Sequence, residues 1–186
     1  MNGKTKTIAA MGMLCALAYA ATAVGRVPLV LFLKYDPKDV ILAIGGFAFG
    51  PSASFAAALA VSLAELLTIS ETGPWGFVMN VISSCSFACT ASFLYKRRRT
   101  LPGAAAGLLA GWVCMVCVML FWNYLVAPIY MGYPRQAVAQ LLLSVFLPFN
   151  LIKGGVNAAL TLLLYRPLTA ALSPLPACHI LDDKLM

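Results

Sequence analysis

The chain has 186 residues, of which 62% are hydrophobic and 10% are charged, and its mean hydropathy is +0.90. A soluble domain carries about 25% charged residues, so this composition cannot supply a wetted surface and excludes a soluble globular protein. The formal net charge of +7 does not indicate a nucleic-acid partner. Basic residues in a membrane protein anchor cytoplasmic loops beside anionic lipid. We therefore predict an integral membrane protein.

The first apolar stretch follows Lys4 and Lys6, as in a secretory signal peptide. It is longer than the apolar core of most signal peptides, so we expect an uncleaved first span. This stretch carries Gly12-x-x-x-Ala16-x-x-x-Ala20. Small residues four apart form a smooth stripe that another helix can approach closely. The stripe can pack inside the bundle or receive a partner protein.

The rest of the chain continues as apolar stretches separated by turn signals. A helix crosses the hydrocarbon with about 20 residues; the second stretch is shorter, and Gly50-Pro51 separates it from the third by a tight turn. The pattern predicts an all-α membrane protein, a compact bundle of six transmembrane helices in one domain over residues 1–186. The expected spans are about 8–24, 38–50, 52–70, 75–95, 102–126 and 146–166.

One dense basic run, Lys96 to Arg99, follows the fourth expected span. The positive-inside rule places this run in the cytoplasm. Alternating outward from it predicts that both termini are cytoplasmic. The segment 26–38, RVPLVLFLKYDPK, is then external, and it is too apolar for a free solvated loop. We expect either a lid over a pocket or a re-entrant, interfacial segment.

Polar residues cluster in the outer halves of the expected spans. In the last span Asn150, Lys153 and Asn157 are spaced i, i+3 and i+7 and share one helix face. The same outer depth is occupied in three other spans by Glu65, Asn80 and Asn123. The cytoplasmic halves are mainly apolar. We therefore predict a polar pocket that opens outward above an apolar plug, which can capture a solute but offers no route inward.

These polar residues also have structural interpretations. Ionisable residues inside a membrane are functional by default, yet Lys153 could simply form an ion pair with Glu65. Asn80 and Asn157 could hold helices together by hydrogen bonds. Asn123, near the interface, could belong to an aromatic belt.

The sequence lacks the motifs of catalysis and of energy coupling. There is no GxxxxGK[ST] loop, and the six cysteines and single histidine suggest neither a metal site nor a nucleophilic triad. We therefore predict no enzyme activity, no cofactor and no metal. Few ionisable groups lie at depth, so an autonomous secondary carrier is only an alternative.

Several sequence patches resemble the substrate-binding S components of energy-coupling factor (ECF) transporters, and most closely the riboflavin-specific ones. The patches are KYDPKDV at 34–40, GGFAFGPSAS at 45–54, TGPWGFVMN at 72–80, NYLVAPIYM at 123–131 and PFNLIKGGVN at 148–157. The resemblance covers nearly the whole chain.

This resemblance implies high-affinity capture of riboflavin from outside a prokaryotic cell by a multi-pass plasma-membrane subunit. The implied partners are a transmembrane T component and two ATPase subunits, besides membrane lipid. An S component for a different vitamin or precursor is the alternative. Asn123, Asn150 and Lys153 match polar residues that hydrogen-bond the flavin, and Tyr35 and Asp36 match the first-loop lid. The stripe Gly12, Ala16, Ala20 matches the face that docks the T component.

Overall fold

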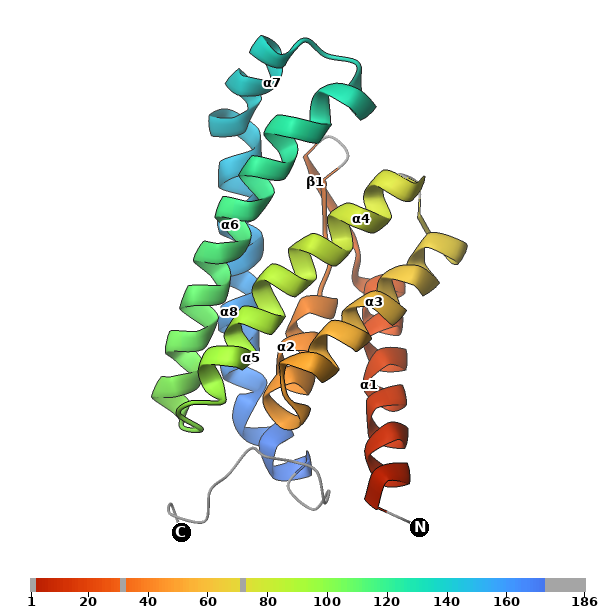
Figure 1. Ribbon diagram of the computed structural model, residues 1–186, viewed down its shortest axis with the longest axis vertical. Helices are drawn as coiled ribbons and strands as arrows, with labels where there is room; N and C mark the ends of the chain where they lie inside the picture. The colour runs from red at the N-terminus through yellow and green to blue at the C-terminus, as the bar shows by residue number, and fades with distance from the viewer. Residues whose placement is uncertain (1–2, 31–32, 71–72, 173–186) are drawn as a thin grey trace.

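The computed structural model describes residues 3–30, 33–70 and 73–172, and Figure 1 shows how their helices are arranged. The elements in chain order are α1 (Gly3–Gly25), β1 (Val27–Val30), β2 (Leu33–Tyr35), α2 (Lys38–Phe49), α3 (Pro51–Thr68), α4 (Gly73–Ser84), the π-helix η1 (Cys85–Cys89), α5 (Thr90–Tyr95), α6 (Leu101–Met131), α7 (Arg135–Leu141), the π-helix η2 (Leu142–Phe146) and α8 (Leu147–Leu172). The expected all-α helical bundle is confirmed.

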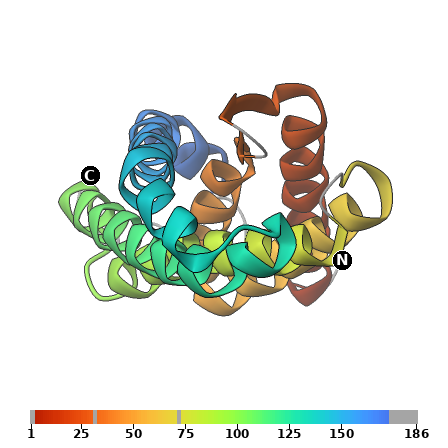
Figure 2. The same cartoon turned by 90° about the horizontal axis from the view of Figure 1, so that it is seen from above.

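The helices form two layers, which are visible end-on in Figure 2. In one layer α2 packs between α1 and α8, and in the other α4 with α5 packs between α3 and α6. The two layers meet through contacts of α1 and α2 with α3, and of α6 with α8. A hydrophobic core that includes Phe47, Phe87, Leu108 and Met115 lies between them.

Within the described residues, five helical stretches are long and apolar enough to cross a membrane: Thr5–Gly25, Pro51–Thr68, Gly73–Tyr95, Leu101–Met131 and Arg135–Pro167. The sequence predicted that the last span begins at about residue 146. The structure instead continues one helical path from Arg135 through the π-helical turn of η2 into α8.

Helix α2 corresponds to the second expected span, about 38–50, but it has only 12 residues. At about 1.5 Å per residue it is too short to cross the hydrocarbon alone. Almost all of its side chains are buried, including both charged residues of its first turn, Lys38 and Asp39. Gly50 ends the helix with φ of 94°, which L side chains rarely adopt, and this permits the tight turn into α3.

The segment 26–38 contains a short antiparallel hairpin, β1–β2, that the sequence did not predict. The hairpin lies toward the end of the bundle away from the start of α1 (Figure 1), and seen from above it lies between α1 and α8 (Figure 2). Leu33 is 2% exposed and packs in an apolar cluster with Ala127, Val138, Phe146 and Phe149. The hairpin is therefore held against the bundle, as expected of a lid.

Candidate functional site

A cavity lies beneath the hairpin, between α3, α4, α6 and α8. Its lining residues are Arg26, Leu33, Lys34, Asp36, Ser62, Glu65, Leu66, Ser70, Phe77, Met79, Asn80, Ser83, Met119, Phe149, Asn150 and Lys153. The free volume is about 50 Å³, whereas small-molecule sites typically have about 300–1,000 Å³. A solute of ordinary metabolite size can therefore enter only if the hairpin or lining side chains move.

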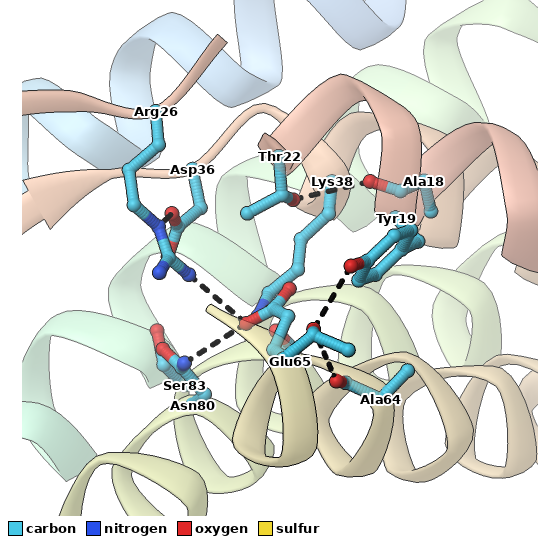
Figure 3. Close-up of polar contacts among 12 residues, drawn as sticks. Ala18, Tyr19, Thr22, Arg26, Asp36, Lys38, Ala64, Glu65, Asn80 and Ser83 are labelled. Atoms are coloured by element: carbon cyan, nitrogen blue, oxygen red, sulfur yellow. Dashed lines mark hydrogen bonds and ion pairs between the residues drawn. The ribbon is translucent and has the colours of Figure 1, made fainter. Parts of the chain in front are cut away.

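Glu65 of α3 is the centre of an ion-pair cluster on one wall of this cavity (Figure 3). Its carboxylate accepts hydrogen bonds from Lys38 Nζ at 2.7 and 2.8 Å, from Arg26 Nη2 at 3.0 Å and from Asn80 Nδ2 at 3.2 Å. Arg26 also bonds Asp36 Oδ1 at 2.7 Å. The Glu65 and Lys38 side chains are only 1% and 0% exposed, so each charge is compensated almost entirely by the other residues of the cluster.

Arg26 and Asp36 flank the hairpin, so their ion pair closes its base, and the Arg26–Glu65 contact ties that base to α3. Burial lowers the pKa of Arg26, but the carboxylates of Asp36 and Glu65 outweigh this effect and raise the pKa above its usual value. The guanidinium therefore stays charged at physiological pH. This arrangement clasps the hairpin over the cavity.

Lys153 of α8 does not pair with Glu65, the partner that the sequence suggested as an alternative. Its Nζ lies 3.4 Å from Asp39 Oδ2 and 3.4 Å from Ser83 Oγ. Asp39 also accepts hydrogen bonds from Ser84 Oγ at 2.5 Å and Asn157 Nδ2 at 3.3 Å. The alternative of a Lys153–Glu65 ion pair is therefore wrong, because Glu65 is paired with Lys38 and Arg26.

The two contacts of Lys153 are longer than the 2.7–2.9 Å typical of charge-assisted hydrogen bonds, and the side chain also lines the cavity. Its ammonium has three donors. Asn150 donates to the carbonyl of Phe146 at 2.7 Å, and its Oδ1 has no partner among the described residues. One wall of the cavity thus offers hydrogen-bonding groups that the protein itself uses weakly.

Two predicted site residues lie beside the cavity and do not line it. Asn123 is fully buried, donates to the carbonyl of Met119 and accepts from the hydroxyl of Tyr130. Tyr35 donates its hydroxyl to Asn157 Oδ1 at 2.8 Å. Burial, with the nearby carboxylates of Asp39 and Asp36, raises the pKa of Tyr35 to about 12, so this hydroxyl stays protonated.

The structure thus gathers Asp36, Glu65, Asn80, Asn150 and Lys153 around one cavity. Sequence reasoning missed other polar residues of the same region: it assigned no role to Lys38 or Asp39, and it did not place Ser62 and Ser83 at the cavity. Helical spacing could have found the serines, because Ser62 precedes Glu65 by three residues and Ser83 follows Asn80 by three.

The apolar part of the lining comes from Phe77, Met79, Met119 and Phe149, with Leu33 contributed by the hairpin. Aromatic and thioether side chains suit a flat apolar ligand. Among the described residues, no group of three or more His, Cys, Asp or Glu side chains could hold a metal ion. The helical bundle, its lidded cavity and its few convergent polar groups define a membrane-embedded solute-binding protein.

Comparisons with known proteins agree with this class. Residues 6–165 match the family described as "ECF transporter, substrate-specific component". The chain is 32% identical over 184 residues to the riboflavin transporter RibU of Staphylococcus aureus, covering 90% of this chain and 96% of that protein. It is 30% identical over 158 residues to the riboflavin transporter FmnP of Bacillus subtilis, covering 80% and 83% of the two chains.

A solved structure of the S component of a bacterial ECF transporter superposes with a TM-score of 0.79 at 30% identity. The match covers 91% of this chain and 98% of that one. The chain therefore belongs to the ECF transporter substrate-specific component family, a family of non-catalytic transporter subunits.

Proposed function

We propose that this chain captures riboflavin from outside the cell, as the substrate-specific subunit of an ATP-driven ECF transporter. The observation that carries the proposal is the cavity wall formed by Asn150 and Lys153, whose polar groups are weakly used by the protein, facing Phe77, Met79 and other apolar side chains. Riboflavin has a flat aromatic ring system with carbonyl and nitrogen acceptors along one edge. A lysine and an amide can donate to that edge while the apolar side chains cover the ring.

Selectivity follows from the same groups. A buried donor that finds no acceptor loses the hydrogen bond it would make to water. An analogue without the acceptor edge would leave Lys153 poorly satisfied, and it would bind more weakly. Asn123 and Tyr35, which lie just outside the cavity, can join the site if the hairpin shifts when ligand enters. Glu65 and Asn80 bound the opposite wall, and Asp36 belongs to the lid.

Orientation is also part of the proposal. The basic run from Lys96 to Arg99 lies at the end of the bundle where α1 starts, and the hairpin lies toward the other end (Figure 1). If the positive-inside rule holds, the cavity opens outward and the N-terminus is cytoplasmic. The hairpin then acts as a lid on the outer side.

Capture alone does not move a solute across the membrane, so the function needs partners. We assign the docking of a transmembrane T component, which is energised by two ATPase subunits, to the stripe Gly12, Ala16, Ala20 of α1. All three residues are exposed, and a Cβ placed on Gly12 would meet no atom within 4 Å. The opposite face of α1, with Ala10, Ala18 and Thr22, is buried in the bundle. A smooth outward stripe suits close approach by a partner helix.

The experiment that tests the proposal is the visible absorption spectrum of the protein purified in detergent, followed by mass identification of any bound molecule and titration with riboflavin. A yellow preparation with stoichiometric riboflavin is the expected result. A colourless protein that also fails to bind added riboflavin would refute the flavin assignment and direct the search to other vitamins. Uptake by vesicles that contain this chain alone would instead indicate an autonomous carrier.

A further inference from the structure

Six polar residues of the cavity form three pairs, each with a spacing of three residues on one helix. Helix α3 runs toward the hairpin, whereas α4 and α8 run away from it (Figure 1). One member of each pair therefore lies about 4.5 Å deeper than the other, at about 1.5 Å per residue. We call Glu65, Asn80 and Asn150 the outer row, and Ser62, Ser83 and Lys153 the inner row.

The protein uses the hydrogen-bonding capacity of the two rows differently. In the outer row Glu65 accepts four hydrogen bonds, and Asn80 and Asn150 each donate one. In the inner row Lys153 makes two long contacts, with Ser83 Oγ and with Asp39 Oδ2, each at 3.4 Å. Ser62 is 1% exposed, and its Oγ has no hydrogen-bond partner in the part of the chain that the structure describes.

An unpaired buried hydroxyl is uncommon, because buried polar groups in native structures nearly always have partners. Ser62 lines the cavity, so a ligand group can supply the missing partner. Lys153, in the same row, has donors only. It therefore calls for a carbonyl or another acceptor, and a neighbouring N–H of the ligand would need an acceptor of its own. A serine hydroxyl can provide that acceptor.

We propose that Ser62 contacts the ligand and determines specificity by accepting a hydrogen bond from the N–H of an amide- or imide-type edge whose carbonyl is held by Lys153. The inference rests on the proposed function, and it adds the part of the ligand that reaches the inner row. Riboflavin carries such an imide edge. The flat ring then stands with its polar edge toward the cavity floor.

The test compares the whole protein with Ser62→Ala and with a matched control, Ser54→Ala, in detergent. Ser54 lies on the same helix and is fully buried, but its Oγ donates to the carbonyl of Leu42 at 3.1 Å. The readouts are the riboflavin dissociation constant and the melting temperature without ligand. Ser62→Ala should weaken riboflavin binding about 5- to 10-fold, the loss expected for one neutral hydrogen bond.

Melting without ligand gives a signature that a structural role would not produce. Ser62→Ala removes a hydroxyl without a partner, so its melting temperature should not fall below that of the wild type. Ser54→Ala should show the opposite pattern, with lower thermal stability and unchanged affinity. A riboflavin analogue methylated at the imide nitrogen should bind the wild type and Ser62→Ala with nearly equal affinity, because the N–H is gone from both complexes.

Three results would overturn the inference while the proposed function stands: unchanged riboflavin affinity in Ser62→Ala, a fall in its melting temperature like that of Ser54→Ala, or an undiminished affinity difference with the methylated analogue. If the wild type itself does not bind riboflavin, the proposed function fails and the inference fails with it. The two failures are therefore distinguishable by the wild-type titration alone.

Discussion

Replacing Glu65 with Gln tests whether the cluster around this carboxylate is the main electrostatic support of the part of the bundle beneath the hairpin. The substitution keeps the shape of the side chain and removes one negative charge. Both described contacts of Lys38, at 2.7 and 2.8 Å, go to Glu65, and Lys38 is fully buried. The variant therefore leaves an ammonium without a counter-ion in a site that water does not reach.

The expected effect is a loss of about 3–5 kcal/mol in the free energy of unfolding, the usual result of removing one partner of a buried ion pair. Arg26 contributes less to this loss, since it keeps Asp36 at 2.7 Å. The assay is unfolding of the detergent-solubilised protein by titration with a denaturing detergent. The double variant Glu65→Gln with Lys38→Met is the control. It removes the stranded charge and should regain at least half of the lost stability.

Two results would refute this reasoning. A loss below about 1 kcal/mol in Glu65→Gln would place the pair among weakly coupled surface ion pairs. A double variant that is no more stable than the single one would show that the loss does not come from the unpaired Lys38. In that case the hydrogen bond from Asn80 at 3.2 Å would be the next contact to remove.

Three further substitutions separate binding, gating and coupling. Lys153→Met should weaken riboflavin binding by about 100-fold or more, as expected when a buried charge-assisted contact is lost. An affinity within about 3-fold of that of the wild type would show that Lys153 does not belong to the binding site. Arg26→Gln should break the ion pairs that hold the base of the hairpin. In stopped-flow fluorescence it should raise the dissociation rate of riboflavin more than it changes the association rate. Equal rates in the variant and the wild type would contradict a role of Arg26 in closure. Ala16→Trp should leave riboflavin affinity unchanged and abolish ATP-dependent uptake by the assembled transporter; normal uptake would exclude that face as the docking site.

The sequence was sufficient to predict the helical bundle and the convergence of several polar residues on one cavity. Apolar stretches are long enough to locate helices, and the spacing of Asn150 and Lys153 follows directly from helical geometry. Because Glu65 and Asn80 are isolated polar residues in apolar runs, their convergence on a common pocket could also be proposed. Each of these predictions depends on local pattern and on the length of a span.

The partners of the charged residues could not be predicted in the same way. Lys38 and Asp39 follow a proline at the boundary between the segment 26–38 and the expected span 38–50, and nothing in this position indicates a partner for either charge. The structure buries both residues because α2 is surrounded by α1, α3 and α8. Which carboxylate pairs with which cation then depends on how α2 is placed relative to α3 and α8, and no spacing within one helix contains that information.

The hairpin escaped prediction for a related reason. Its strands, Val27–Val30 and Leu33–Tyr35, are too short for alternation to be distinguished from an apolar run. The strands are stabilised by the bundle beneath them, through contacts such as that of Leu33 with Phe149 and Val138. From the local sequence alone we could infer only that the segment 26–38 is too apolar to be a solvated loop.

The burial of Lys38 and Asp39 at the start of α2 also constrains the order in which the chain can be assembled in the membrane. A stretch of 12 residues that begins with two charges is a poor candidate for independent insertion by the translocon. The cation paired with Asp39 in the structure belongs to α8, near the end of the chain. We therefore expect α2 to stay at the interface, or to enter with α3 as a helical pair, until the last helix has been synthesised. Chains truncated before α8 should consequently expose α2 to quality-control proteases even though the other preceding helices are complete.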